Sequence, residues 1–189
     1  MPSPSEQVKY QTTTMLQLLR GVKADQWGNP TPCEKWTVRD LANHLVGGGR
    51  MVAASFRGET VEIDPEAPMP DMCGDDPVGA VAAALADFEA AADAPGAMEH
   101  DVTLPFATLP AQVALNIAKF DILVHCWDLA TATGQTFNPP DDVVVEGQQM
   151  AEMLIAPQAR DGDTFKDVVG TTAGATPMQR LAAFTGRQV

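Results

Sequence analysis

KFDILVHCWDLATATGQ, residues 119–135, is a mostly apolar stretch in which two carboxylates and an imidazole recur at regular spacing. Asp121, His125 and Asp128 follow one another at intervals of four and three residues, as do neighbours on one face of an α-helix. At about 100° per residue they lie within a sector of about 60°. Apolar side chains cover the other directions, and a helix that is apolar on nearly all sides is usually buried. The polar stripe is therefore predicted to face the protein interior or a cavity.

A metal ion is one explanation for charged groups at such a place, because a buried carboxylate is costly unless it is paired or coordinated. Asp121 and His125, one helical turn apart, can direct an oxygen and a ring nitrogen at one ion. A third ligand must come from another helix. Of the two other histidines, His44 lies on the core-facing side of a predicted helix, whereas His100 lies in an acidic loop. We therefore predict a metal site of His44, Asp121 and His125, with Asp128 orienting a histidine or holding a water.

Spacing alone leaves a second interpretation open. In it, His44 and His125 are core histidines that are satisfied by local hydrogen bonds. Asp121 and Asp128 then pair with basic side chains at the surface, for which the candidates are Arg39, Arg50 and Lys119. In the first interpretation, by contrast, a His/His/carboxylate set would bind an ion and leave some of its coordination positions open, as catalytic ions require.

The chain as a whole is predicted to form an all-α bundle in a single domain, residues 1–189. Abundant alanine favours helices over strands. We expect four sizeable helices with long cross-connections, a further helix and a short C-terminal helix, at about 5–22, 37–57, 77–94, 111–133, 141–155 and 177–186. Residues 100–110 read as an extended connection with a short strand-like piece. The Pro- and acid-rich residues 59–76 read as a long surface loop that borders the site.

Local signals mark the ends of two of these helices. Thr37 followed by Asp40 is a capping-box pair, and Gly134 is a typical residue after a helix C-terminus. Three consecutive glycines, 47–49, interrupt the second helix at a cost of about 1 kcal/mol each relative to alanine. They indicate a close helix approach, or free space near His44 for a ligand, or a kink or early end of the helix.

Composition narrows the classes of partner. The net charge is −13, with 25 acidic against 12 basic residues, so nucleic acid and anionic membranes are not expected as partners. The first residues resemble no signal peptide, and no apolar run reaches the roughly 18 residues that span a bilayer. A cytoplasmic protein is expected, either a monomer or a homodimer. Cys33, Cys73 and Cys126 form no metal-binding spacing and are interpreted as ordinary thiols.

Two segments resemble one known family. TPCEKWTVRDLANHLVGGGR, residues 31–50, is similar to the second-helix signature of DinB-like metal-binding proteins related to mycothiol-dependent maleylpyruvate isomerase. That signature has a Pro-Cys and a W-[ST]-V-x-D-L before a histidine and a Gly-rich turn. DILVHCWDLATATGQ, residues 121–135, resembles the fourth-helix segment, with an acid and a histidine four apart before Trp-Asp-Leu. PMQRLAAFTGR, residues 177–187, resembles the C-terminal tail of single-domain members.

The resemblance implies a DinB-like four-helix bundle with a divalent ion, often zinc, between its helices. The family's ligands fall on His44, Asp121 and His125. Asp121 stands where the isomerase itself has the longer glutamate, and the chain has no room for the isomerase's additional C-terminal domain. Maleylpyruvate isomerisation is therefore not the expected reaction.

Two functions follow from the residues and the resemblance. The first is a metal-dependent enzyme in which a low-molecular-weight thiol such as mycothiol, activated on the ion, is transferred or added to a small electrophile. The second is a non-catalytic bundle that binds a metal or a small ligand. An exchangeable position on the ion, with a cavity beside it, distinguishes the first from the second.

Overall fold

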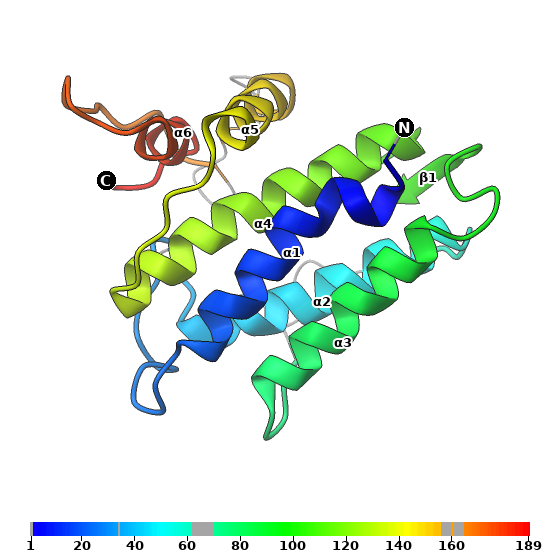
Figure 1. Ribbon diagram of the computed structural model, residues 1–189, viewed down its shortest axis with the longest axis horizontal. Coiled ribbons are helices and arrows are strands. Elements are labelled where there is room, and N and C mark those ends of the chain that lie inside the picture. The colour runs from blue at the N-terminus through cyan, green and yellow to red at the C-terminus, as the bar shows by residue number, and fades with distance from the viewer. Residues whose placement is uncertain (1, 34, 62–69, 156–159, 161–164) are drawn as a thin grey trace.

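The computed structural model describes residues 2–33, 35–61, 70–155, 160 and 165–189, and its fold is mostly helical (Figure 1). The helices are α1 (Pro4–Arg20), α2 (Val38–Phe56), α3 (Pro77–Ala92), α4 (Ala111–Thr133), α5 (Asp141–Leu154) and α6 (Pro177–Phe184). A small antiparallel hairpin of β1 (Asp101–Leu104) and β2 (Ala107–Pro110) lies between α3 and α4. It occupies the segment predicted to be extended, so the fold is helical with one hairpin.

Helices α1 to α4 enclose the main hydrophobic core. Helices α1 and α2 each contact both α3 and α4. Large side chains that are fully buried among them include Met15 and Leu19 of α1, Phe56 of α2 and Phe88 of α3. The apolar stripe of each helix thereby leaves water, which is the main favourable contribution to folding.

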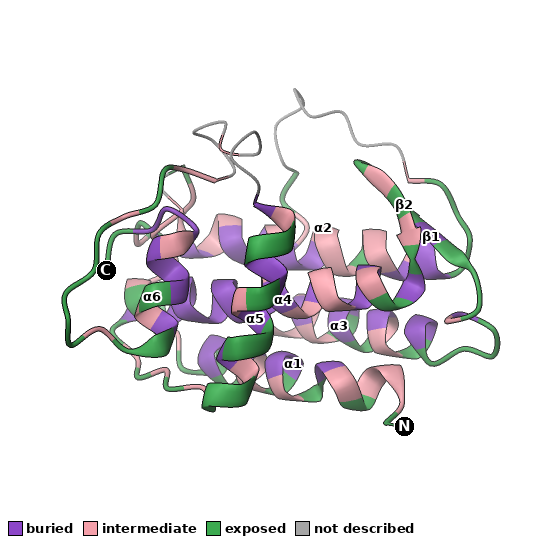
Figure 2. Cartoon of the chain, turned by 90° about the horizontal axis from the view of Figure 1, so that it is seen from above, coloured by how far each residue is buried: buried purple, intermediate pink, exposed green. Residues whose placement is uncertain are grey.

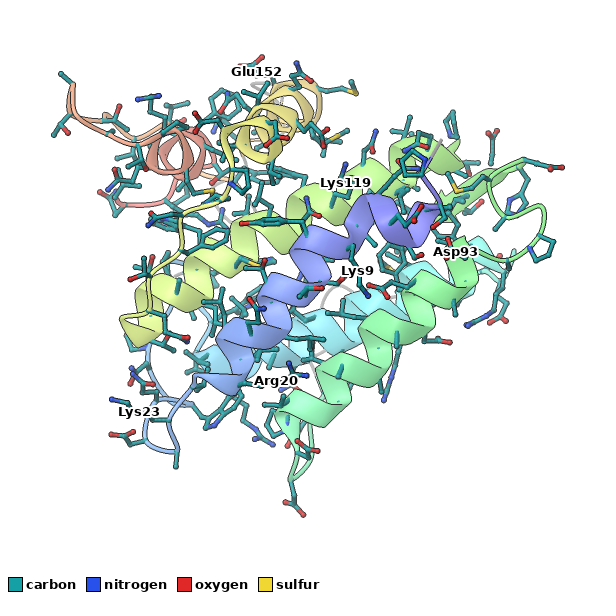
Figure 3. All side chains as sticks on the ribbon, in the orientation of Figure 1. Lys9, Arg20, Lys23, Asp93, Lys119 and Glu152 are labelled. Carbon is teal, nitrogen blue, oxygen red and sulfur yellow. The ribbon has the colours of Figure 1, made fainter. Side chains whose placement is uncertain are left out.

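Helix α4 joins this core to a second one. Fifteen side chains of α4 are buried, in agreement with its apolar sequence on nearly every side. On α5, exposed positions face outward (Figure 2). Helices α5 and α6 lie across α4 from α2 and α3 and form a smaller apolar cluster with it (Figure 1). Lys119 of α4, labelled in Figure 3, also forms an ion pair with Glu146 of α5 at 2.7 Å.

The predicted helix ends are confirmed where capping residues defined them. The Thr37 hydroxyl accepts a hydrogen bond from the backbone N–H of Asp40, and the Asp40 carboxylate accepts one from the backbone of Thr37. This pairing satisfies two N–H groups that a helix N-terminus leaves without partners. Gly134 ends α4 at a φ of 69°, in the left-handed region that glycine adopts without strain.

The connection between α2 and α3 is attached to α2 through one buried amide. The Asn43 side-chain oxygen accepts from the backbone N–H groups of Met72 and Cys73, at 2.8 and 3.0 Å. The expectation that the whole loop 59–76 borders the site falls partly on residues 62–69, which lie outside the described residues.

One of the three glycines of α2, Gly49, lies at a close approach of two helices. The helix continues through residues 47–49 to Phe56, so the alternative of an early helix end is wrong. A Cβ on Gly49 would lie 3.2 Å from Ala84 of α3, a tight contact, whereas one on Gly48 would meet no described atom within 4 Å.

Substitutions at these two neighbouring glycines are expected to have opposite effects on stability. Gly49→Val should lower the free energy of unfolding by about 1–3 kcal/mol, because the added atoms force α2 away from α3. Gly48→Ala, the matched control, should raise it by about 0.5–1 kcal/mol through helix propensity. Urea unfolding followed by circular dichroism measures both. Equal effects of the two changes would contradict the close approach at Gly49.

Across the described residues, no helix is both long enough and apolar enough to cross a membrane.

Candidate metal centre

The structure brings the three predicted ligands together between α2 and α4. Nε2 of His44 lies 3.3 Å from Oδ2 of Asp121, and Nε2 of His125 lies 3.4 Å from Oδ1 of the same carboxylate. The centroids of the two imidazole rings are 4.8 Å apart. The three ligand-type atoms all lie within 4.8 Å of one another.

Two helices hold these side chains in place. The spacing of four residues on α4 stacks Asp121 and His125 on one face, and α2 presents His44 opposite them. The polar stripe of α4 is unevenly buried: Asp128 is fully buried, the side chain of His125 is 7% exposed and that of Asp121 is 44% exposed. The side chain of His44, on α2, is 29% exposed. Because Asp121 and His44 lie at the wall of a cavity, the site is open on one side.

The donor atoms fit a divalent ion of the zinc type. Two imidazole nitrogens and one carboxylate oxygen are ligands that zinc prefers, and three protein ligands are typical of a site with an open position. For bonds of about 2.0–2.1 Å, neighbouring ligands of a tetrahedral ion lie about 3.3–3.4 Å apart. The separations of 3.3 and 3.4 Å between Asp121 and the two histidines are of this size, but they join His44 to Oδ2 and His125 to Oδ1, so they are not edges of one set with a single carboxylate oxygen.

Asp128 lies behind His125 in a buried network with the C-terminal segment. Asp128 is fully buried, and Arg187 is only 8% exposed. Arg187 donates from Nε to Oδ1 of Asp128 at 2.7 Å and from Nη2 to Oδ2 at 2.8 Å. The same Oδ2 lies 2.9 Å from Nδ1 of His125. Since a carboxylate only accepts hydrogen bonds, Nδ1 is the donor in this contact.

The surface ion pairs of the alternative interpretation do not form as proposed. Asp128 pairs with Arg187 instead of a surface base. Arg39 pairs with Asp71, and Lys119 pairs with Glu146. Asp121 instead contacts His44 and His125, and Asp128 contacts His125 and Arg187.

The charged groups shift one another's pKa values. Burial alone would raise the pKa of Asp121, but the charges of His125 and His44 hold it well below its ordinary value. Burial would lower the pKa of His125, yet Asp121 raises it well above its ordinary value, with further hydrogen bonds adding to the effect. For Asp128, burial opposes ionisation, while Arg187 and the His125 hydrogen bond lower the pKa to about 2. The site therefore stabilises the ionised form of both carboxylates, because positively charged groups lie beside them.

A cavity of about 380 Å³ opens beside the three ligands. Trp36 lies in its wall and packs against both imidazoles, with its ring centroid 4.7 Å from that of His44 and 5.7 Å from that of His125. The lining also includes aromatic and basic side chains, among them Phe120, Phe165, Lys35, Lys166 and Arg187. The volume is sufficient for a small organic ligand.

The charge of this cavity differs from that of the chain. The net charge of −13 offers no reason to expect attraction of an anion. Three basic residues nevertheless line the cavity, namely Lys35, Lys166 and Arg187, and Asp121 is its one acidic lining residue among those the structure describes. Of these three, Arg187 is paired with the buried carboxylate of Asp128.

The cysteines occupy two kinds of environment. Cys73 and Cys126 are buried, and burial raises the pKa of both thiols, which keeps them protonated. Cys33 is half-buried in the cavity wall, where its Sγ lies 3.3 Å from Oδ2 of Asp128 and 3.2 Å from Nη2 of Arg187. Cys33 thus differs from the other two cysteines in lying at the cavity beside charged side chains.

Sequence reasoning missed Cys33, Trp36 and Arg187 as parts of the site. Cys33 and Trp36 precede α2 and could have been identified from the sequence, because both lie within the segment that resembles the family signature. Arg187 lies in the C-terminal segment that resembles the tail of single-domain members, but its pairing with Asp128, 59 residues earlier, leaves no local pattern.

Comparisons with known proteins identify the family of this chain. The sequence model of the mycothiol maleylpyruvate isomerase N-terminal domain matches residues 8–130. Two uncharacterized proteins of Mycobacterium tuberculosis, MT0763 of strain CDC 1551 and Rv0738 of strain H37Rv, are each 40% identical over 173 residues, which is 91% of this chain and 91% of theirs. No solved structure shows a significant match. The matched range contains His44, Asp121 and His125, and the chain belongs to the mycothiol maleylpyruvate isomerase N-terminal domain family.

Proposed function

We propose that this protein binds a divalent ion, zinc, through His44, Asp121 and His125, and promotes the reaction of a low-molecular-weight thiol of the mycothiol type with a small electrophile. The reaction would be a thiol transfer or a thiol-dependent isomerisation. When bound, the ion would lower the pKa of a thiol beside it and so supply a thiolate nucleophile.

One observation carries this proposal: the three ligand-type side chains lie at the wall of a cavity of about 380 Å³. A purely structural zinc site is closed by four protein ligands, whereas a catalytic one keeps a position open toward substrate. The family's description supports mycothiol as the class of thiol. The arrangement of α1 to α4 supports a DinB-like four-helix bundle.

The protein's own residues have separate tasks in this proposal. His44, Asp121 and His125 hold the ion. Trp36 packs against both imidazoles and limits their rotation. Phe120 and Phe165 supply apolar surface to exclude water around the reacting groups.

Thiol binding is tested by thermal unfolding of the zinc-loaded and the chelator-treated protein. Cysteine is the probe and serine its matched control, since the two differ only in sulfur. Cysteine at about 100 times its Kd should stabilise the zinc-loaded protein by about 2.7 kcal/mol, and serine should not. The cobalt-loaded protein should gain a thiolate-to-metal absorption band with cysteine. Zinc binding without any cysteine-specific shift would favour the non-catalytic metal-binding bundle.

A further inference from the structure

Arg187 lies outside the part of the chain that matches the family model, yet it reaches the candidate metal centre. The match ends at residue 130, and Arg187 follows α6, two residues from the end of the sequence. Its guanidinium is buried and contacts three parts of the network: both oxygens of Asp128, the Oγ1 of Thr185 and the Sγ of Cys33. The segment after α6 thereby forms part of the wall around His125.

The two-point contact determines how the Asp128 carboxylate is oriented. Nε and Nη2 of Arg187 bind Oδ1 and Oδ2 separately, in the planar fork geometry that matches a carboxylate. With both oxygens held, the carboxylate plane cannot rotate freely. Its Oδ2 is directed at Nδ1 of His125, at 2.9 Å.

The orientation of Asp128 in turn determines which nitrogen of His125 faces the cavity. The hydrogen bond from Nδ1 to Asp128 leaves Nε2 directed toward Asp121, on the side where His44 lies. Metal-binding histidines commonly donate their second N–H to a carboxylate, which fixes the ring and makes the other nitrogen a better ligand. Arg187 does not contact the candidate ligand His125 directly but acts on it through Asp128.

We propose that Arg187 is a positioning residue of the metal centre: it holds the Asp128 carboxylate so that His125 presents Nε2 to the ion, and the C-terminal segment thereby sets the affinity of the site for zinc. This rests on the proposed metal site. Changes in such outer partners typically reduce metal affinity 10–100-fold.

The C-terminal segment has other anchors, so the effect of Arg187 can be separated from folding. The backbone N–H of Arg187 donates to the carbonyl of Ala182, and that of Val169 donates to the carbonyl of Ala183. Leu181 of α6 is fully buried against α5 and α4. A side chain at position 187 that does not need a buried charged partner should therefore leave the segment in place.

The test measures zinc affinity by competition with a chromophoric chelator in Arg187→Lys and in the double variant Asp128→Leu/Arg187→Met. The double variant removes both charges together and is expected to fold, since no buried charge is left unpaired. We expect it to bind zinc 10–100-fold more weakly than the parent, and Arg187→Lys to lie between the two, because lysine keeps the charge but not the fork. The matched control is Asp87→Leu/Arg57→Met, which removes an exposed ion pair and should leave zinc affinity unchanged.

The visible spectrum of the cobalt-loaded protein gives a second readout that a purely structural role would leave unchanged. The double variant should alter the ligand-field bands because His125 is less well oriented, whereas the surface control should not. Zinc affinity and cobalt spectra equal to those of the parent in both Arg187 variants would overturn the inference and leave the metal site standing. A parent protein that binds no zinc would instead contradict the metal site, and the inference with it. Should the double variant fail to fold, Arg187→Lys decides alone.

Discussion

Replacement of Asp128 by alanine is expected to destabilise the protein by about 3–5 kcal/mol, because it leaves the buried guanidinium of Arg187 without its partner. Arg187 is 8% exposed and forms two hydrogen bonds to this carboxylate. Its remaining contacts, to the hydroxyl of Thr185 and the thiol of Cys33, are neutral and cannot replace a full negative charge. Urea unfolding followed by circular dichroism measures the change in the free energy of unfolding.

The control for this prediction is Asp87→Ala, which breaks the exposed ion pair between Asp87 and Arg57 and should shift the unfolding midpoint far less. Asp128→Leu/Arg187→Met should recover most of the loss, because no charge is left buried and alone. If Asp128→Ala unfolded at the same urea concentration as the parent, the buried pair would not contribute to stability as the structure indicates.

The second large effect is expected on metal content. Protein purified without chelator should contain about one zinc ion per chain, the stoichiometry of a single three-ligand site. His44→Ala and Asp121→Ala each remove a direct ligand and should weaken zinc binding by more than the roughly 10–100-fold that outer partners contribute. His100→Ala is the matched control, since His100 is an exposed histidine whose Nδ1 contacts the backbone oxygen of Asp101. Elemental analysis after gel filtration measures all four proteins.

These three variants separate the site from adventitious binding. Zinc that persists at full stoichiometry in both ligand variants would place the ion elsewhere. Loss of zinc in His100→Ala alone would point to a surface site. Because Asp121 raises the pKa of the buried His125, its replacement also removes a charge partner, so the urea unfolding of Asp121→Ala is measured beside its metal content to separate loss of metal from unfolding.

Much of the helical fold could be predicted from local sequence signals. Helix α4 was predicted with the bounds that the structure shows, because its apolar side chains continue from Ala111 to Thr133 and Gly134 supplies the left-handed cap. The start of α2 was predicted from Thr37 and Asp40 for the same kind of reason. Such signals act within one or two helical turns and need no knowledge of the rest of the chain.

The candidate ligands were only partly determined in this way. The spacing of Asp121 and His125 placed both on one face of α4, and the scarcity of histidines limited the third ligand to few positions. That His44 faces this pair depends on how α2 packs against α4, which the periodicity of either helix leaves open. The close approach of α2 to α3 at Gly49 is likewise a property of two helices together.

The sequence by itself determined the helices, their ends and the polar stripe of α4, because each depends on residues at most a few positions apart. Only the tertiary structure decided what surrounds that stripe. Arg187 reaches Asp128 across 59 residues, Trp36 packs against His44 and His125, and a cavity opens beside these side chains. These contacts depend on where the segments before α2 and after α6 come to lie once the cores have formed, and no local periodicity encodes that position.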